Sequence, residues 1–107
     1  MIALQESLRI EYRKMSDYKI SAYTREKTKK LGVKVKKSKQ PKKKIDVYID
    51  GEVVASVGAK GYMDYPTYLK EKGDDFANER RALYKKRHER YRHKVGSPSY
   101  YADQLLW

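Results

Sequence analysis

The sequence contains no cysteine. This absence excludes disulfide bonds, thiolate catalysis and zinc sites built on cysteine ligands. Long apolar runs are also missing, since no stretch approaches the roughly 20 residues that a membrane-spanning helix needs. The first ten residues, MIALQESLRI, contain Glu6 and no long apolar segment, so we do not expect a secretory signal.

Large aliphatic side chains are scarce. Leu, Ile, Val and Phe together make up 20 of the 107 residues, while the net charge is +12. This combination lies near the composition of disordered chains. Eleven tyrosines offset the shortage, because each supplies a large apolar ring with one polar tip. We therefore expect one small folded domain with a thin core and at least one poorly packed arm.

Positive charge is concentrated in two segments of the chain. Residues 25–44 contain eleven basic side chains and one acidic one, and residues 80–94 contain eight basic side chains and one acidic one. Residues 45–79, which separate them, contain eight acidic and only three basic side chains. Basic segments of this density repel one another and attract polyanions.

The densest run of charge is KVKKSKQPKKK at residues 34–44, which contains seven lysines. Pro41 interrupts any helix or central strand there. We expect either a solvated linker or an arm that lies along a phosphate backbone or another acidic surface. The KKSKQPKKK cluster also has the composition of a nuclear-import signal. On this basis residues 1–44 form an N-terminal extension with a Lys-rich arm, and residues 45–107 form a small folded domain.

The clearest structural pattern is KIDVYIDGEVVASVG at residues 44–58. Apolar residues alternate with polar ones over 45–49, which predicts a strand with Asp46 on its solvent face. Asp50-Gly51 is a preferred pair for a tight type I′ turn. A second strand is expected to return over residues 52–57.

Helices are predicted at four places. We favour a short helix over a strand at residues 3–15, and we expect a short helix at 67–72 and a long one at 75–93. A last helix at 99–107 is apolar enough to dock on the core, with Trp107 as a buried anchor or a partner contact. The predicted fold class is α+β, in which a small β-hairpin packs against two or three C-terminal helices.

The long helix has two predicted faces. Helical spacing places four side chains in a stripe expected to face the core, namely Phe76, Leu83, Tyr84 and Tyr91. Arg80 and Arg87 fall within the same arc. They either lay their stems over tyrosines and pair with aspartates, or bind phosphate oxygens. A continuous basic face is expected on the opposite side, formed by Arg81, Lys85, His88 and Arg92.

No metal or catalytic site is expected. His88 and His93 are five residues apart, which does not place them on one helix face. Asp46, Asp50 and Glu52 could hold a divalent ion in a nuclease, but the strand and the turn already account for them. We therefore expect a non-enzymatic protein without cofactors, with a metal-dependent nuclease as the weakest alternative.

The C-terminal 63 residues resemble a family of small basic proteins of uncharacterised function from large double-stranded-DNA viruses of algae and protists. The resemblance rests on VASVGAKGYMDYPTYLKEKG at 54–73, NERRALYKKRHERYR at 78–92 and GSPSYYADQLLW at 96–107. It implies a viral protein that is packaged in the particle, located in the virion and in the cytoplasm or nucleus of the infected host. The family supplies no catalytic residues to carry over.

These observations predict a basic, virion-associated protein that binds nucleic acid, expected to be packaged double-stranded DNA, with little sequence specificity. The alternative is a minor capsid or cementing protein that threads between larger subunits such as the major capsid protein. The candidate nucleic-acid-binding residues are Lys34, Lys36, Lys37, Lys39, Lys42, Lys43, Lys44, Arg80, Arg81, Lys85, Lys86, Arg87, Arg90 and Arg92.

Overall fold

Residues 43–59 form the hairpin that their alternating pattern predicts. In a computed structural model, which describes residues 18–107, β2 (Lys43–Ile49) pairs antiparallel with β3 (Glu52–Ala59). Asp50 and Gly51 join them with φ angles of 52° and 81°. A type I′ turn requires positive φ at both central residues. The predicted strand–turn–strand unit is therefore confirmed.

The sheet has a third strand that the sequence did not predict. β1 (Lys34–Lys37) pairs antiparallel with β2, so that Lys36 lies opposite Asp46 and the strand order is β1-β2-β3. Three of the four residues of β1 are lysines. Short edge strands rich in lysine resist pairing with other chains. The lysine-rich segment is thus part of the sheet in the structure, where the sequence predicted an extended arm.

The core lies between one face of the hairpin and α5 (Pro98–Leu106). Ile45 and Leu105 have no exposed surface, and Leu106 is 1% exposed. The buried core cluster consists of Ile45, Val47, Ala55, Val57, Tyr101, Leu105 and Leu106. The predicted docking of the last helix on the core is confirmed. Its first turn is held by Ser97, whose Oγ accepts a hydrogen bond from the backbone N–H of Tyr100 at 3.2 Å.

The folded unit begins before residue 45. α2 (Ala22–Leu31) packs against α5, and the Thr24 hydroxyl donates a 2.8 Å hydrogen bond to the backbone carbonyl of Leu105. Gly32 ends this helix in the left-handed conformation and leads directly into β1. Residues 22–44 therefore belong to the same fold as the C-terminal part, which differs from the expected division at residue 45. The helix predicted at 3–15 lies outside the described residues.

The position of Asp46 also differs from the sequence prediction. The sequence pattern placed it on the solvent face of its strand, but only 3% of the residue is exposed. The turn that follows β1 contacts this carboxylate. Ser38 and Ser56 donate hydroxyl hydrogen bonds to Oδ1 of Asp46 at 2.5 and 2.7 Å, and the Lys39 backbone N–H donates to Oδ2 at 3.1 Å.

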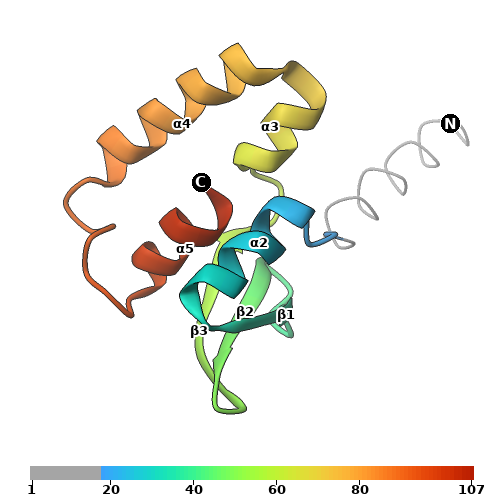
Figure 1. Ribbon diagram of the computed structural model, residues 1–107, viewed down its shortest axis with the longest axis vertical. Coiled ribbons are helices and arrows are strands. Elements are labelled where there is room, and N and C mark those ends of the chain that lie inside the picture. The colour runs from blue at the N-terminus through green and yellow to red at the C-terminus, as the bar shows by residue number, and fades with distance from the viewer. Residues whose placement is uncertain (1–17) are drawn as a thin grey trace, which may run out of the picture.

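Two helices connect the sheet to α5. α3 (Tyr65–Lys72) is followed after Gly73 by α4 (Asp74–His88), and Figure 1 shows the two arching over α5 on the side away from the sheet. α4 ends five residues before the predicted end at 93. Residues 89–95 turn back toward α5 instead, with the N–H groups of Tyr91 and Arg92 bonded to the carbonyl of His88.

The predicted core stripe of α4 is wrong for three of its four residues. Tyr84 is 8% exposed, but Phe76, Leu83 and Tyr91 are 42%, 48% and 55% exposed. The buried side of the helix is instead centred on Ala77 and Tyr84. Spacing gives the angles between residues on a helix, but it does not give the arc that meets the core. Within residues 18–107, no helix combines the length and apolar character needed to cross a bilayer.

Candidate functional site

Several predicted site residues are used by the fold itself. Lys44 is 5% exposed, and its Nζ lies 3.0 Å from Oδ2 of Asp64, which is 1% exposed. Asp64 also caps α3, because its Oδ1 accepts hydrogen bonds from the backbone N–H and the hydroxyl of Thr67. The Tyr18 hydroxyl donates to the same carboxylate at 2.8 Å, and burial together with Asp64 raises the pKa of Tyr18. Lys44 is therefore not available to an external polyanion.

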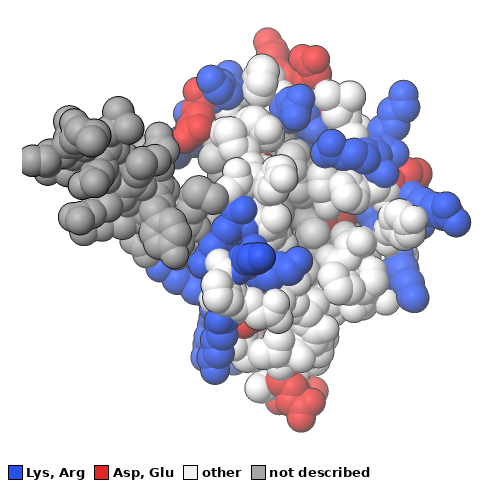
Figure 2. All heavy atoms as spheres, turned by 180° about the vertical axis from the view of Figure 1, so that it is seen from behind, with Lys and Arg blue, Asp and Glu red and all other residues white. Residues whose placement is uncertain are grey.

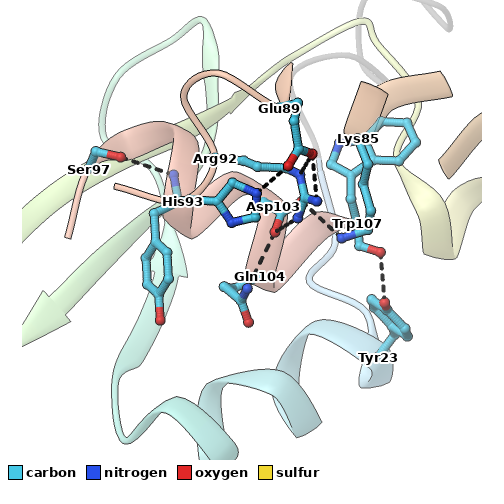
Figure 3. Close-up of polar contacts among 10 residues, drawn as sticks. Tyr23, Lys85, Glu89, Arg92, His93, Ser97, Asp103, Gln104 and Trp107 are labelled. Carbon is cyan, nitrogen blue, oxygen red and sulfur yellow. Dashed lines mark hydrogen bonds and ion pairs between the residues drawn. The ribbon is translucent and has the colours of Figure 1, made fainter. Parts of the chain in front are cut away.

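A second buried carboxylate fixes the end of α4 (Figure 3). The Asp103 carboxylate on α5 forms two ion pairs. Its Oδ1 lies 2.9 Å from Nζ of Lys85, and its Oδ2 lies 3.5 Å from Nη1 of Arg92. Arg92 also pairs with Glu89 at 2.7 Å, and Glu89 contacts His93 at 2.5 Å. These partners lower the pKa of Glu89 and raise that of Arg92. The cluster fastens the C-terminal end of α4 and residues 89–93 to α5.

The expected outer basic face of α4 faces the protein instead. The Arg81 guanidinium lies 4.0 Å from the centre of the Tyr65 ring, and Lys85 meets Asp103. His88 stacks on Tyr84 with ring centres 4.2 Å apart. The reason is that buried carboxylates and tyrosine rings of α3 and α5 attract these cations. Arg81, Lys85 and Arg92 are therefore corrected from outward-facing binding residues to residues that stabilise the fold.

A different group of lysines remains open to solvent. We name Lys34, Lys36, Lys39 and Lys42 the lysine edge, because they lie on β1 and on the turn between β1 and β2. All four are exposed, and none forms an ion pair with a carboxylate of residues 18–107. Lys36 also lies 5.4 Å from the centre of the Tyr48 ring. Lys37 is exposed on the same strand. These side chains project from a folded edge, not from a free arm.

The other predicted cations meet around a groove. A groove of about 1020 Å³ lies between β3, α5 and the α3–α4 arch, and Lys43, Arg80, Lys86 and Arg87 are among the residues that line it. Lys43 comes from the first basic segment and the other three come from the second. The fold thus brings members of the two basic segments to one site. Arg90, the remaining predicted residue, is exposed and lies 5.7 Å from the centre of the Tyr91 ring.

Aromatic rings form one side of the groove. Trp107 stacks on Tyr84 with ring centres 4.3 Å apart and planes within 6° of each other, and His88 covers the other face of Tyr84. Burial and the nearby Asp103 carboxylate raise the pKa of Tyr84 to about 12. Burial and the charge of Arg87 lower the pKa of His88. At neutral pH the stack is therefore uncharged.

Charge is distributed unevenly over the surface. Figure 2 shows Lys and Arg side chains around a central area of other residues, while Asp and Glu side chains gather mainly at the two ends of the view. The acidic hairpin turn with Asp50 and Glu52 and the α3–α4 junction with Asp74 and Asp75 carry much of the negative charge.

Sequence reasoning missed two features of the site. Arg25 and Lys30 on α2 are also exposed cations close in sequence to the lysine edge; they are among the eleven basic residues counted over 25–44 but were not named as binding candidates. The stacking of Trp107 on Tyr84 had no local signal, because the two residues are far apart in the chain. Within residues 18–107, no three His, Asp or Glu side chains come together as a metal site would require.

Comparisons with known proteins gave no match. No protein-family model matches the chain, and no curated protein or solved structure matches it.

Proposed function

We propose that the protein binds nucleic acid through the phosphate backbone without reading the base sequence. The lysine edge carries this proposal, since it presents four exposed ammonium groups, none of which forms an ion pair with a carboxylate of residues 18–107. Lysine is a flexible point charge that suits phosphate oxygens in any register. The resemblance to proteins of large DNA viruses makes packaged double-stranded DNA the expected polyanion.

The test is the salt dependence of DNA binding by the full chain. Fluorescence anisotropy with a labelled duplex measures the affinity of the wild type and of the Lys36→Gln/Lys39→Gln variant over a range of salt concentrations. Each phosphate contact contributes about 0.9 to the slope of log affinity against log salt. The variant should therefore bind more weakly and show a slope that is shallower by roughly 2.

The matched control is Lys70→Gln/Lys72→Gln. It removes the same charge from the exposed last turn of α3, beside Glu71 and outside the lysine edge. Its slope should stay close to that of the wild type. Equal changes in both variants would mean that net charge alone drives binding. No binding at about 50 mM salt would remove the proposal.

A structural role between larger protein subunits is the second candidate. It is favoured by the exposure of Phe76 and Leu83 on α4, because apolar side chains at helical spacing are typical of helix-binding surfaces. The two functions are compatible, since the lysine edge and the apolar side of α4 use different residues.

A further inference from the structure

We propose that the groove binds an acidic amphipathic helix from a partner protein. The inference starts from a stripe on α4 formed by Phe76, Arg80, Leu83 and Arg87, which are separated by four, three and four residues. This spacing keeps side chains on one side of a helix and is the spacing by which two helices pack together. Within residues 18–107 this stripe is covered only in part, by Tyr68 of α3, since Phe76 and Leu83 are still 42% and 48% exposed.

The exposure of one leucine does not by itself indicate a binding site, because single apolar side chains are common on protein surfaces. Leu83, however, lines the same groove as Met63, Ala102 and Trp107, which are half-buried. The groove therefore offers apolar side chains from α4, from α5 and from the chain before α3. Phe76 extends the stripe beyond the groove and packs on Tyr68, with ring centres 5.6 Å apart.

The charge of the groove identifies the chemistry of the ligand. Five Lys and Arg side chains line it. Lys44 pairs with Asp64, and the other four pair with no carboxylate of residues 18–107; they are Lys43, Arg80, Lys86 and Arg87. The one acidic side chain in the lining is Asp64, which is buried and already bound to Lys44. A ligand with Asp or Glu beside apolar side chains complements this surface.

The spacing of the arginines adds a geometric requirement. Arg80 and Arg87 are seven residues apart, which places them about 10 Å apart along the axis of α4. A helix lying along α4 presents side chains with the same repeat. The ligand therefore carries carboxylates seven residues apart, with apolar side chains between them to meet Leu83.

The stacked Tyr84 ring disfavours single-stranded nucleic acid as the occupant. Proteins hold unpaired bases by stacking them on free ring faces. Tyr84 has one face covered by Trp107 and the other by His88, and the residue is only 8% exposed. A base could stack there only after the existing stack had separated. Apolar side chains of a peptide need no free ring face.

The experiment begins with selection from a displayed library of random peptides about 15 residues long, roughly four helical turns. The bait is the full chain. Selected peptides should be acidic, with apolar residues at helical spacing and carboxylates seven residues apart. Their binding is then measured with synthetic peptides through the fluorescence of Trp107, which is the single tryptophan of the chain and lines the groove. We expect a saturable change in its emission.

Two matched pairs of variants locate the binding site. Arg80→Gln/Arg87→Gln should weaken peptide binding at least about tenfold, while Lys70→Gln/Lys72→Gln should leave it unchanged. Leu83→Ser should weaken it more than Val95→Ser, because Val95 is 79% exposed and does not line the groove. All these side chains are exposed or half-exposed, so the variants are expected to fold.

Three outcomes would overturn the proposal. The first is selection of no sequence, or of sequences that are neutral or basic. The second is equal weakening of peptide binding by the groove pair and by its control pair. The third is a change in Trp107 emission with an oligothymidylate strand alone that Arg80→Gln/Arg87→Gln abolishes, since the groove would then bind single-stranded nucleic acid. The Lys36→Gln/Lys39→Gln variant should bind the peptide normally, so this test is separate from that of the lysine edge.

Discussion

Lys36 and Lys44 lie in one lysine-rich segment, yet the fold uses them in opposite ways. Lys44 is buried against Asp64, whereas Lys36 is exposed on β1 and pairs with no carboxylate of residues 18–107. The same contrast holds on α4 between Lys85, which meets Asp103, and its neighbour Lys86. The difference shows that counting charges along a sequence does not reveal which cations can meet a partner. Buried carboxylates decide which cations the fold uses.

The largest effect on stability is expected at Lys44. Lys44→Met keeps much of the stem but leaves the Asp64 carboxylate buried without its cation. Removing one partner of a buried ion pair costs about 3 to 5 kcal/mol of unfolding free energy. Urea unfolding of the variant and of the wild type measures this loss.

The control for this prediction removes the second charge as well. In Lys44→Met/Asp64→Asn, the amide oxygen can still accept the hydrogen bond from the backbone N–H of Thr67. The double variant should therefore be more stable than Lys44→Met alone. If it is equally unstable or less stable, the unpaired charge is not the cause of the loss.

A smaller effect is expected at Lys85. Its side chain is 35% exposed, and Arg92 remains beside Asp103 when Lys85 is removed. Lys85→Gln should therefore cost about 1 to 2 kcal/mol in urea unfolding. Lys86→Gln is the matched control, because it removes the same charge from an exposed position one residue further on, and its effect should stay within about 0.5 kcal/mol. Equal losses of unfolding free energy in the two variants would contradict the prediction that Lys85 stabilises the fold and Lys86 does not.

The hairpin and the last helix could be predicted because their signals are local. Asp50-Gly51 specifies the turn, and the apolar residues of 101–107 match one face of a helix. β1 could not be predicted in the same way. Its lysines and Pro41 indicate a solvated arm, and only pairing with β2 and partial burial of Val35 against the core stabilise it as a strand. The two strands are neighbours in the chain, but their pairing depends on tertiary contacts that strand propensity alone does not reveal.

The orientation of α4 also depends on distant residues. The sequence placed Arg80 and Arg87 on one arc and Arg81 and Lys85 on the opposite one, and the structure preserves that separation. The buried arc is shifted toward the predicted basic face, because Asp103 attracts Lys85 and the Tyr65 ring attracts Arg81, while Tyr84 of the predicted core stripe stays buried. A sequence does not show that a carboxylate such as Asp103 will be buried. The predicted basic face therefore contacts the protein, and most of the predicted core stripe is exposed.

Asp46 is buried like Asp64 and Asp103, but the groups that donate hydrogen bonds to it are uncharged. It holds the turn that carries part of the lysine edge, through the Ser38 hydroxyl and the Lys39 backbone N–H. Burial alone would raise the pKa of Asp46, but these hydrogen bonds and one from Ser56 outweigh burial and lower it. The folded state therefore binds this proton less readily than the unfolded state does.

The smallest effect is a pH dependence of stability that follows from this shift. An aspartate in an unfolded chain has a pKa of about 3.9, so the stability that Asp46 contributes is complete above about pH 5 and is lost as the pH falls through its lower folded pKa. Asp46→Asn does not titrate. Urea unfolding from about pH 6 to pH 2.5 should show the wild type more stable at the upper end, with the gap to the variant narrowing below about pH 4. A gap that stays constant over this range would mean that the carboxylate is not held in its charged form, and the turn of the lysine edge would then depend on packing alone.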